Sequence, residues 1–229
     1  TQLIEKERMA AIGATAGMVG HDLRNPLQSI IGEVYMARNE LEKLPDSEHK
    51  ASLQENIRAI AEQISYMNKI VSDLQTFVKP VEPIMQIVKL KPLIAALLSK
   101  TITPNNIQAS IQIDDTLTVE ADPQLLKRVL INLVTNAMQA MPEGGEIRII
   151  AQADSAEQVQ ITVEDTGTGI PEEIKPKLFT PLFTTKSKGQ GFGLAVCKRV
   201  IEAMRGTISF ESQQGKGTKF LISLPKSSN

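Results

Sequence analysis

The amino-acid sequence predicts an α+β chain with two domains, an N-terminal helical hairpin and a second domain of helices over a largely antiparallel sheet. Two observations predict this division. Apolar residues recur at alternating steps of four and three through about residues 3–79, which is typical of bundled helices. Segments with a strand period of two follow the prolines at 80 and 83. We therefore expect domains over 1–82 and 83–229, and 229 residues are enough for both.

The composition excludes several classes of protein. Lys and Arg number 25 against 26 Asp and Glu, and aromatic residues make up 3% of the chain, so nucleic-acid binding is not expected. A single cysteine, Cys197, excludes an intramolecular disulfide and fits a reducing compartment. No apolar run approaches the roughly 18 residues that span a bilayer. We expect a cytoplasmic segment that does not insert into a membrane.

The first domain has a regular apolar seam in both arms, which the polar turn at 44–50 separates. The second arm places its seam at Leu53, Ile57, Ile60, Ile64, Met67, Val71, Leu74 and Val78. The first arm keeps the rhythm at Ile12, Ala16, Val19 and Leu23 and, after a phase break of one residue at Pro26, resumes it at Leu27, Ile30, Val34, Ala37, Leu41 and Leu44. Two such helices cannot bury their seams alone, so we expect a homodimer in which two hairpins form a four-helix bundle.

The second domain alternates helical and strand-like patterns, beginning with an extended stretch over 84–88. Strands are expected over 107–113, 117–120, 146–153, 158–164, 207–211 and 218–224. Helices are expected over 92–103, 122–141, 172–178 and 193–205.

Two motifs in this domain suit a flat, aminated ligand and a polar contact beside it. Asn132 and Asn136 lie one helical turn apart at the edge of an apolar face. Asp165 ends a strand and precedes Gly167 and Gly169, where backbone can approach a ligand and the carboxylate can accept a bond from an amine such as that of adenine. Taken singly, the first motif is also compatible with two solvated amides, and the second with a plain turn.

Glycines also precede the helix that begins near Leu194. Gly189, Gly191 and Gly193 would leave backbone amides at a helix N-terminus, which is a place for phosphate, although a flexible helix cap has the same pattern. The segment 179–183 places two phenylalanines and a threonine where a closing lid would lie. The turn before Thr218 is also compatible with an ordinary hairpin.

Taken together and in this order, these motifs resemble the ATP-binding domain of the GHKL superfamily, and within it that of the sensor histidine kinases. The resemblance implies a Bergerat-type α/β sandwich with a mobile lid that binds ATP and Mg²⁺. It assigns Asn136 to Mg²⁺, Asn132 to the phosphates, Asp165 to the adenine amine and Thr218 to support of that contact. Some kinases carry a lysine where this chain has Gln139. Here the positive charge is expected from Lys186 or Lys188.

The first domain contains a histidine in a matching context. His21 is followed by Asp22, Asn25 and Pro26, which resembles the phosphoacceptor motif of histidine kinases. It falls between the seam positions 19 and 23 and should face outward, as a solvated surface histidine also would. The resemblance makes His21 the nucleophile and Asp22 its base, and it gives Asn25 a role in dephosphorylating a partner.

We therefore expect the transmitter core of a dimeric sensor histidine kinase. It would phosphorylate His21 from Mg-ATP and pass the phosphoryl group to an aspartate of a response regulator receiver domain, with phosphatase activity toward that regulator as a further expectation. The pattern over residues 3–7 suggests an incoming helix from a sensor module outside this chain. A GHKL ATPase clamp without a phosphoacceptor and a degenerate binding module are the alternatives.

Overall fold

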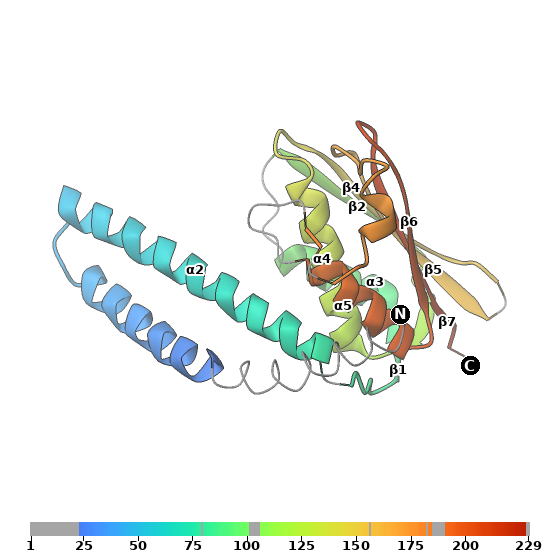
Figure 1. Ribbon diagram of the computed structural model, residues 1–229, viewed down its shortest axis with the longest axis horizontal. Helices are drawn as coiled ribbons and strands as arrows, with labels where there is room; N and C mark the ends of the chain where they lie inside the picture. The colour runs from blue at the N-terminus through green and yellow to red at the C-terminus, as the bar shows by residue number, and fades with distance from the viewer. Residues whose placement is uncertain are drawn as a thin grey trace. The chain divides into compact units, whose positions relative to one another are not determined.

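The computed structural model describes residues 23–78, 80–100, 106–155, 157–181, 183–184 and 191–227, with the backbone alone at 69, 73–78 and 100. The chain divides into two compact units, Thr1–Pro80 and Val81–Asn229 (Figure 1). None of the described helices combines the length and apolar content that crossing a membrane requires.

The first unit is a helical hairpin, as predicted. A helix over 23–42 and α2 (Glu48–Val78) are joined by a short turn. The Oγ of Ser47 accepts a bond from the Lys50 backbone N–H at 3.1 Å and so caps α2. The Lys50 ammonium donates to the Leu44 carbonyl at 2.6 Å and to Asp46 at 2.8 Å. The hydrogen bond from Lys50, and then its charge, lower the pKa of Asp46.

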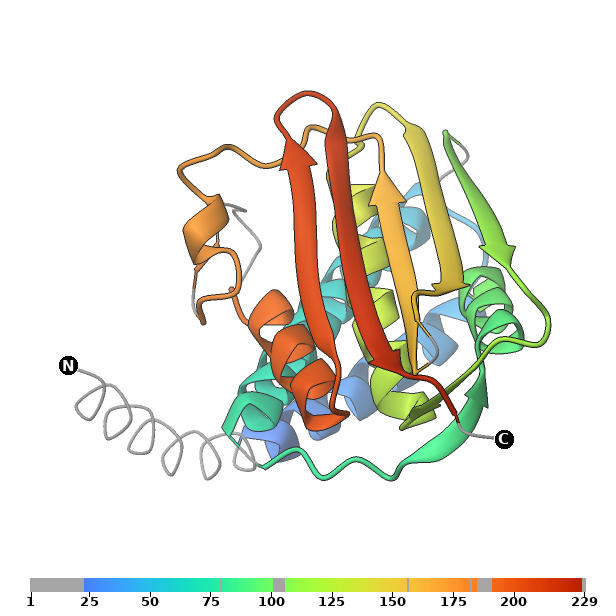
Figure 2. The same cartoon turned by 90° about the vertical axis from the view of Figure 1, so that its right-hand side faces the viewer.

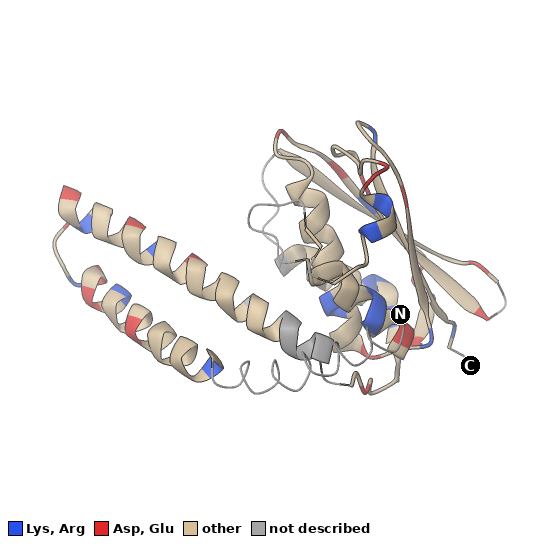
Figure 3. Ribbon diagram, in the orientation of Figure 1, with Lys and Arg blue, Asp and Glu red and all other residues tan. Residues whose placement is uncertain are grey.

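The seam of this hairpin is half closed within one chain. Leu27, Ile64 and Val71 form a buried cluster, against which Val34 packs. Six other seam residues are 43–51% exposed: Leu23, Ile30, Leu44, Leu53, Ile60 and Met67. In each helix both sets follow a seven-residue spacing, so one stripe closes the hairpin and a second stripe stays open. Acidic and basic residues alternate along the remaining faces (Figure 3), including the i, i+4 pairs Arg38–Glu42 and Arg58–Glu62.

The second unit contains a five-stranded sheet with the order β2-β4-β5-β7-β6, in which β2 and β4 are parallel and the other neighbours antiparallel. Its strands are β2 (Ile107–Ile113), β4 (Gly145–Ala153), β5 (Gln158–Asp165), β6 (Thr207–Gln213) and β7 (Gly217–Pro225). Figure 2 shows helices α3 (Leu90–Lys100), α4 (Pro123–Gln139) and α5 (Gly193–Ala203) on one face of this sheet. The result is a two-layer α/β sandwich.

The core lies between the helices and the sheet. Leu126, Leu130 and Leu133 follow the helical period on α4 and are fully buried, as are Ile161 and Ile222 on the strands. On the other face of the sheet, Arg148 pairs with Glu164 at 3.7 Å and Lys219 with Glu211 at 3.9 Å. The sequence alternation has therefore placed one face in the core and the other toward water.

Two expectations about the helices are corrected. The helix expected over 172–178 is a single 3₁₀ turn, η1 (Lys175–Lys177), and Pro176 inside it has no backbone donor for a longer helix. The helix expected to begin at 92 begins at Leu90, because a proline in the first turn removes a donor that lacks a helical partner anyway. The extended stretch before it contains a strand, β1 (Gln86–Lys89), which pairs with β3 (Thr118–Ala121) in a separate two-stranded sheet.

Candidate active site

Helix α4 carries the first group of site residues. Asp122 caps the helix by accepting bonds from the backbone of Gln124 at 2.9 Å and Leu125 at 3.1 Å. The apolar face of α4 faces the core, which leaves Asn132 and Asn136 half-buried at its edge. The Asn136 amide donates to the Asn132 Oδ1 at 3.2 Å, so the two side chains that the sequence singled out are in contact.

The Asn132 amide also lies against the first turn of α5. A Cβ atom added to Gly193 would stand 2.7 Å from the Asn132 Nδ2 and 3.0 Å from its Oδ1. Gly193 and Leu194 open α5, directly after Gly191 and the buried Phe192. The N-cap residue, Phe192, has an apolar side chain, which makes no capping hydrogen bond. The backbone amides at the start of α5 and the positive end of its dipole therefore suit an anion beside Asn132.

Asp165 and Thr218 form the second group. They are directly opposite each other on β5 and β7, and both are 6% exposed. The Oδ1 of Asp165 accepts bonds from the backbone N–H of Gly167 at 2.9 Å and of Thr218 at 3.3 Å, which fixes the carboxylate at the end of its strand. Gly217 has a φ of +101°, and a Cβ there would overlap the Asp165 carbonyl oxygen at 2.0 Å. Strands β5 and β7 can approach this closely because residue 217 has no side chain.

Ala140 connects the two groups. Its backbone N–H donates to the Asn136 carbonyl at 3.1 Å, and its own carbonyl accepts from Thr168 at 3.1 Å. The Thr168 carbonyl in turn accepts from Gly215 at 2.7 Å, and Gly169 follows it against the β6–β7 turn. The end of α4, the loop after Asp165 and the β6–β7 turn are therefore one hydrogen-bonded structure.

Ser212 lies at the centre of this network and was not among the residues predicted from the sequence. The strand predicted to end at residue 211 continues, as β6, to Gln213. The Oγ of Ser212 accepts from the Ile170 N–H at 2.9 Å, donates to the Gly217 carbonyl at 2.9 Å and lies 3.0 Å from the Thr218 Oγ1. The alternation of Ile208 and Phe210 would have found it, since residue 212 continues their face of the strand.

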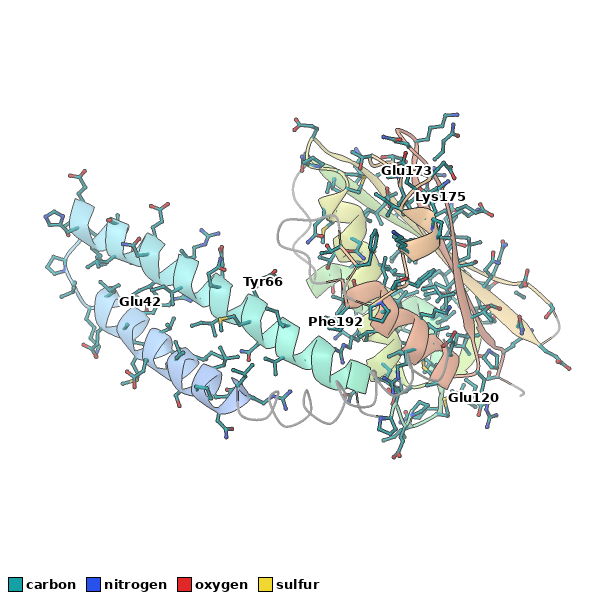
Figure 4. The ribbon with its side chains drawn as sticks, in the orientation of Figure 1. Glu42, Tyr66, Glu120, Glu173, Lys175 and Phe192 are labelled. Carbon is teal, nitrogen blue, oxygen red and sulfur yellow. The ribbon has the colours of Figure 1, made fainter. Side chains whose placement is uncertain are left out.

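The start of the segment expected to act as a lid packs against the sheet and α5. The Phe179 ring meets Phe210 edge to face at 5.8 Å between centroids, and the Lys198 ammonium stands 5.8 Å from the Phe179 centroid. From η1, the Lys175 ammonium donates to the Ser212 carbonyl at 2.6 Å; Figure 4 labels Lys175 and Phe192 on their ribbons.

The remaining site residues are divided between described and undescribed segments. Asn25 is exposed on the helix over 23–42, and its carbonyl accepts a bond from Ser29. Gln139 is exposed at the last turn of α4. His21, Asp22, Lys186, Lys188 and Gly189 lie outside the described residues.

Comparison with known families gives the class to which each unit belongs. Residues 121–228 match the family described as histidine kinase-, DNA gyrase B- and HSP90-like ATPases. Residues 11–82 match the His Kinase A (phospho-acceptor) domain. The ATPase match spans α4, the glycine loops, α5 and β7. Both elements of the resemblance drawn from the sequence are therefore confirmed.

Individual proteins agree with this classification. Sensor histidine kinase ZraS of Escherichia coli (strain K12) is 38% identical over 98% of this chain. The catalytic domain of histidine kinase ThkA is 37% identical, with a TM-score of 0.56, and the match covers 62% of this chain and 95% of that domain. ThkA in complex with the response regulator protein TrrA is 32% identical, with a TM-score of 0.66, over 97% of this chain and 64% of the ThkA chain.

The chain belongs to the histidine kinase family. It carries a phosphoacceptor domain followed by an ATPase-type domain, as the sequence analysis expected. It spans about half the length of the curated relative ZraS, 48% of that protein.

Proposed function

We propose that the chain is the transmitter core of a sensor histidine kinase in the cytoplasm, with a phosphoacceptor domain over 1–82 and a catalytic domain over 83–229. It transfers the γ-phosphoryl group of Mg-ATP to His21 and then to an aspartate of a response regulator. The observation that supports this most is the contact of Asn132 with both Asn136 and the start of α5. This arrangement joins a metal-binding amide to a phosphate-binding helix end.

The nucleotide would lie along the hydrogen-bonded end of the sandwich. The Asp165 carboxylate accepts the exocyclic amine of adenine, with its orientation set by Gly167 and Thr218. The first turn of α5, with Gly191 and Gly193, receives the phosphates beside Asn132. Lys186 and Lys188 supply positive charge from the segment between Phe179 and α5, and Gly189 and Gly169 allow backbone to approach.

Asn136 is the proposed protein ligand of Mg²⁺. The donor set fits this ion, because Mg²⁺ takes one or two protein oxygens together with phosphate oxygens and keeps several waters. Bound there, the ion would supply charge that neutralises the phosphate oxygens. Asn132 holds the Asn136 amide through its Oδ1, which orients the ligand side chain before the nucleotide arrives.

The chemical step belongs to the first domain. A ring nitrogen of neutral His21 attacks the γ-phosphorus, the bond from that phosphorus to the bridging oxygen breaks, and ADP leaves. The Asp22 carboxylate accepts a hydrogen bond from the other ring nitrogen and compensates the positive charge that develops on the imidazole. Phosphoryl transfer depends mainly on positioning and charge neutralisation, so the nucleotide domain needs no nucleophile of its own.

The partner of the phosphorylated histidine is a response regulator receiver domain. The ThkA structure, which this chain resembles at 32% identity, holds a response regulator. Asn25 follows His21 by four residues in the sequence and is exposed, where it would orient a water molecule against the regulator's phosphoaspartate. The chain would then catalyse both phosphorylation and dephosphorylation of that regulator.

Replacing Asn136 tests the nucleotide site directly. Asn136→Ala should cut autophosphorylation about 100-fold or more, equivalent to roughly 2.7 kcal/mol in the transition state, because the metal ligand is lost. The measurement is the initial rate of label incorporation from γ-labelled ATP with Mg²⁺. Asn56→Ala, at an exposed asparagine of α2, is the matched control and should retain the rate. A near-normal rate in Asn136→Ala would overturn the metal assignment.

A further inference from the structure

Ser212 has a defined chemical relation to the adenine subsite that the proposed function does not use. Asp165, Thr218 and Ser212 are directly opposite one another on the adjacent strands β5, β7 and β6. Directly opposite residues project from the same face of a sheet, so the three side chains form a row. In this row the Thr218 hydroxyl lies next to the Asp165 carboxylate, and the Ser212 hydroxyl lies next to Thr218.

Counting protons fixes the direction of each hydrogen bond in this row. A serine hydroxyl has one proton and two lone pairs. The Gly217 carbonyl, 2.9 Å from the Ser212 Oγ, can accept only, so it takes the serine proton. The Ile170 N–H, at 2.9 Å, uses one lone pair of Ser212. The 3.0 Å contact with Thr218 must then be a bond donated by the threonine, because Ser212 has a lone pair left and no proton.

The direction of the bond between Thr218 and Ser212 determines what Thr218 can offer to a ligand. The single hydroxyl proton of Thr218 is committed to Ser212, so Thr218 presents lone pairs to its other neighbours. A purine that reaches Asp165 therefore meets two acceptors, a carboxylate and a hydroxyl oxygen. At position 6, a 6-amino purine carries two donor protons, whereas a 6-oxo purine carries an acceptor oxygen that both groups disfavour.

We propose that Ser212 is a positioning residue that holds Thr218 as a hydrogen-bond acceptor and so sharpens selection of 6-amino over 6-oxo purine nucleotides. The inference rests on the proposed function, in which Asp165 receives adenine. Ser212 is itself held from both sides, because its carbonyl accepts from the Lys175 ammonium and its hydroxyl from Ile170. Without the serine hydroxyl, the Thr218 proton loses its acceptor and can turn toward the ligand.

The test compares equilibrium binding of ATP and inosine triphosphate, which share the sugar and triphosphate, to the full chain. Ser212→Ala should weaken ATP binding about fivefold to tenfold and leave the inosine triphosphate affinity within about twofold, since a single neutral hydrogen bond is at stake. Ser212→Thr keeps a hydroxyl and should restore the wild-type ratio. Ser209→Ala, on the outward face of the same strand, should leave it unchanged.

Ser212→Cys provides a second variant if the alanine chain fails to fold, because it keeps the volume and has a weak donor and acceptor. It should lower the affinity ratio as the alanine does, with the melting temperature of each variant measured alongside. Equal losses for both nucleotides, or an unchanged ratio, would overturn the role of Ser212. A wild-type chain that binds both nucleotides equally would overturn the adenine role of Asp165 itself.

Discussion

Gly193 shows how the absence of a side chain at one position can matter to the site without supporting the fold. Its Cα stands so close to Asn132 that an added methyl group would meet the amide at 2.7–3.0 Å. The three atoms nearest to the added methyl group all belong to the Asn132 side chain, which can move aside while the fold is retained. The added methyl group would displace the Asn132 amide and so disturb its hydrogen bond with Asn136.

Gly193→Ala should therefore weaken binding of Mg-ATP about tenfold and leave the melting temperature within a few degrees of wild type. Titration calorimetry and thermal unfolding on the same samples measure the two effects. Gly32→Ala is the matched control, because a Cβ there meets nothing within 4 Å. If Gly193→Ala binds Mg-ATP normally, Asn132 does not act in nucleotide binding.

The side chains that spacing could predict are those whose partners lie close in sequence. Asn132 and Asn136 are one turn apart, and Gly167 follows Asp165 by two residues, so a local pattern places them. Ser212 lies 42 residues from Ile170, and its contacts depend on strand register. The resemblance predicted support from Thr218, but the serine that orients this threonine required the pairing of β6 with β7.

At the scale of elements, periodicity predicted most helices and strands to within two or three residues. Strands such as β2 and β5 alternate clearly, and α4 has both a cap and a continuous apolar face. The pairing of β1 with β3 was not predictable, because it joins short segments about 30 residues apart. The length of η1 was also not predictable, since its stretch has no apolar period.

Asp122 links two of these elements. Its Oδ1 caps α4, and its Oδ2 accepts the Ile84 N–H at 2.9 Å, just ahead of β1. Asp122 is 8% exposed, so removing it leaves several amides without an acceptor.

Asp122→Ala should lower the free energy of unfolding of the second unit by about 1–3 kcal/mol, the range for a lost cap with buried amides left unpaired. Urea denaturation followed by circular dichroism measures it. Asp115→Ala, which loses an exposed ion pair to Lys91, should change stability by less than about 1 kcal/mol. Equal effects of the two substitutions would show that the Asp122 network contributes no more than a surface charge.

At the scale of the whole molecule, the open stripe of the hairpin needs a partner. Its leucines, isoleucines and methionine are 43–51% exposed in one chain and follow the seven-residue repeat of a bundle. A second hairpin offers the same stripe, and we propose that two chains bury these residues together in a four-helix bundle.

Light scattering should therefore give twice the chain mass of 25.0 kDa at micromolar concentration. Ile60→Lys places a charge in the stripe and should shift the chain to the monomer, because an unpaired buried charge is strongly disfavoured. Ile87→Lys, at an isoleucine of β1 that is 67% exposed, is the control and should remain dimeric. A wild-type monomer would contradict the bundle.

The most direct test of the kinase is incubation of the full chain with γ-labelled ATP and Mg²⁺, followed by treatment of the labelled protein with acid and with base. We predict a label that is lost in acid and kept in base, that is absent from His21→Gln and that persists in His49→Gln. Retention of the label in His21→Gln, or release of free phosphate with no labelled protein, would contradict autophosphorylation on His21.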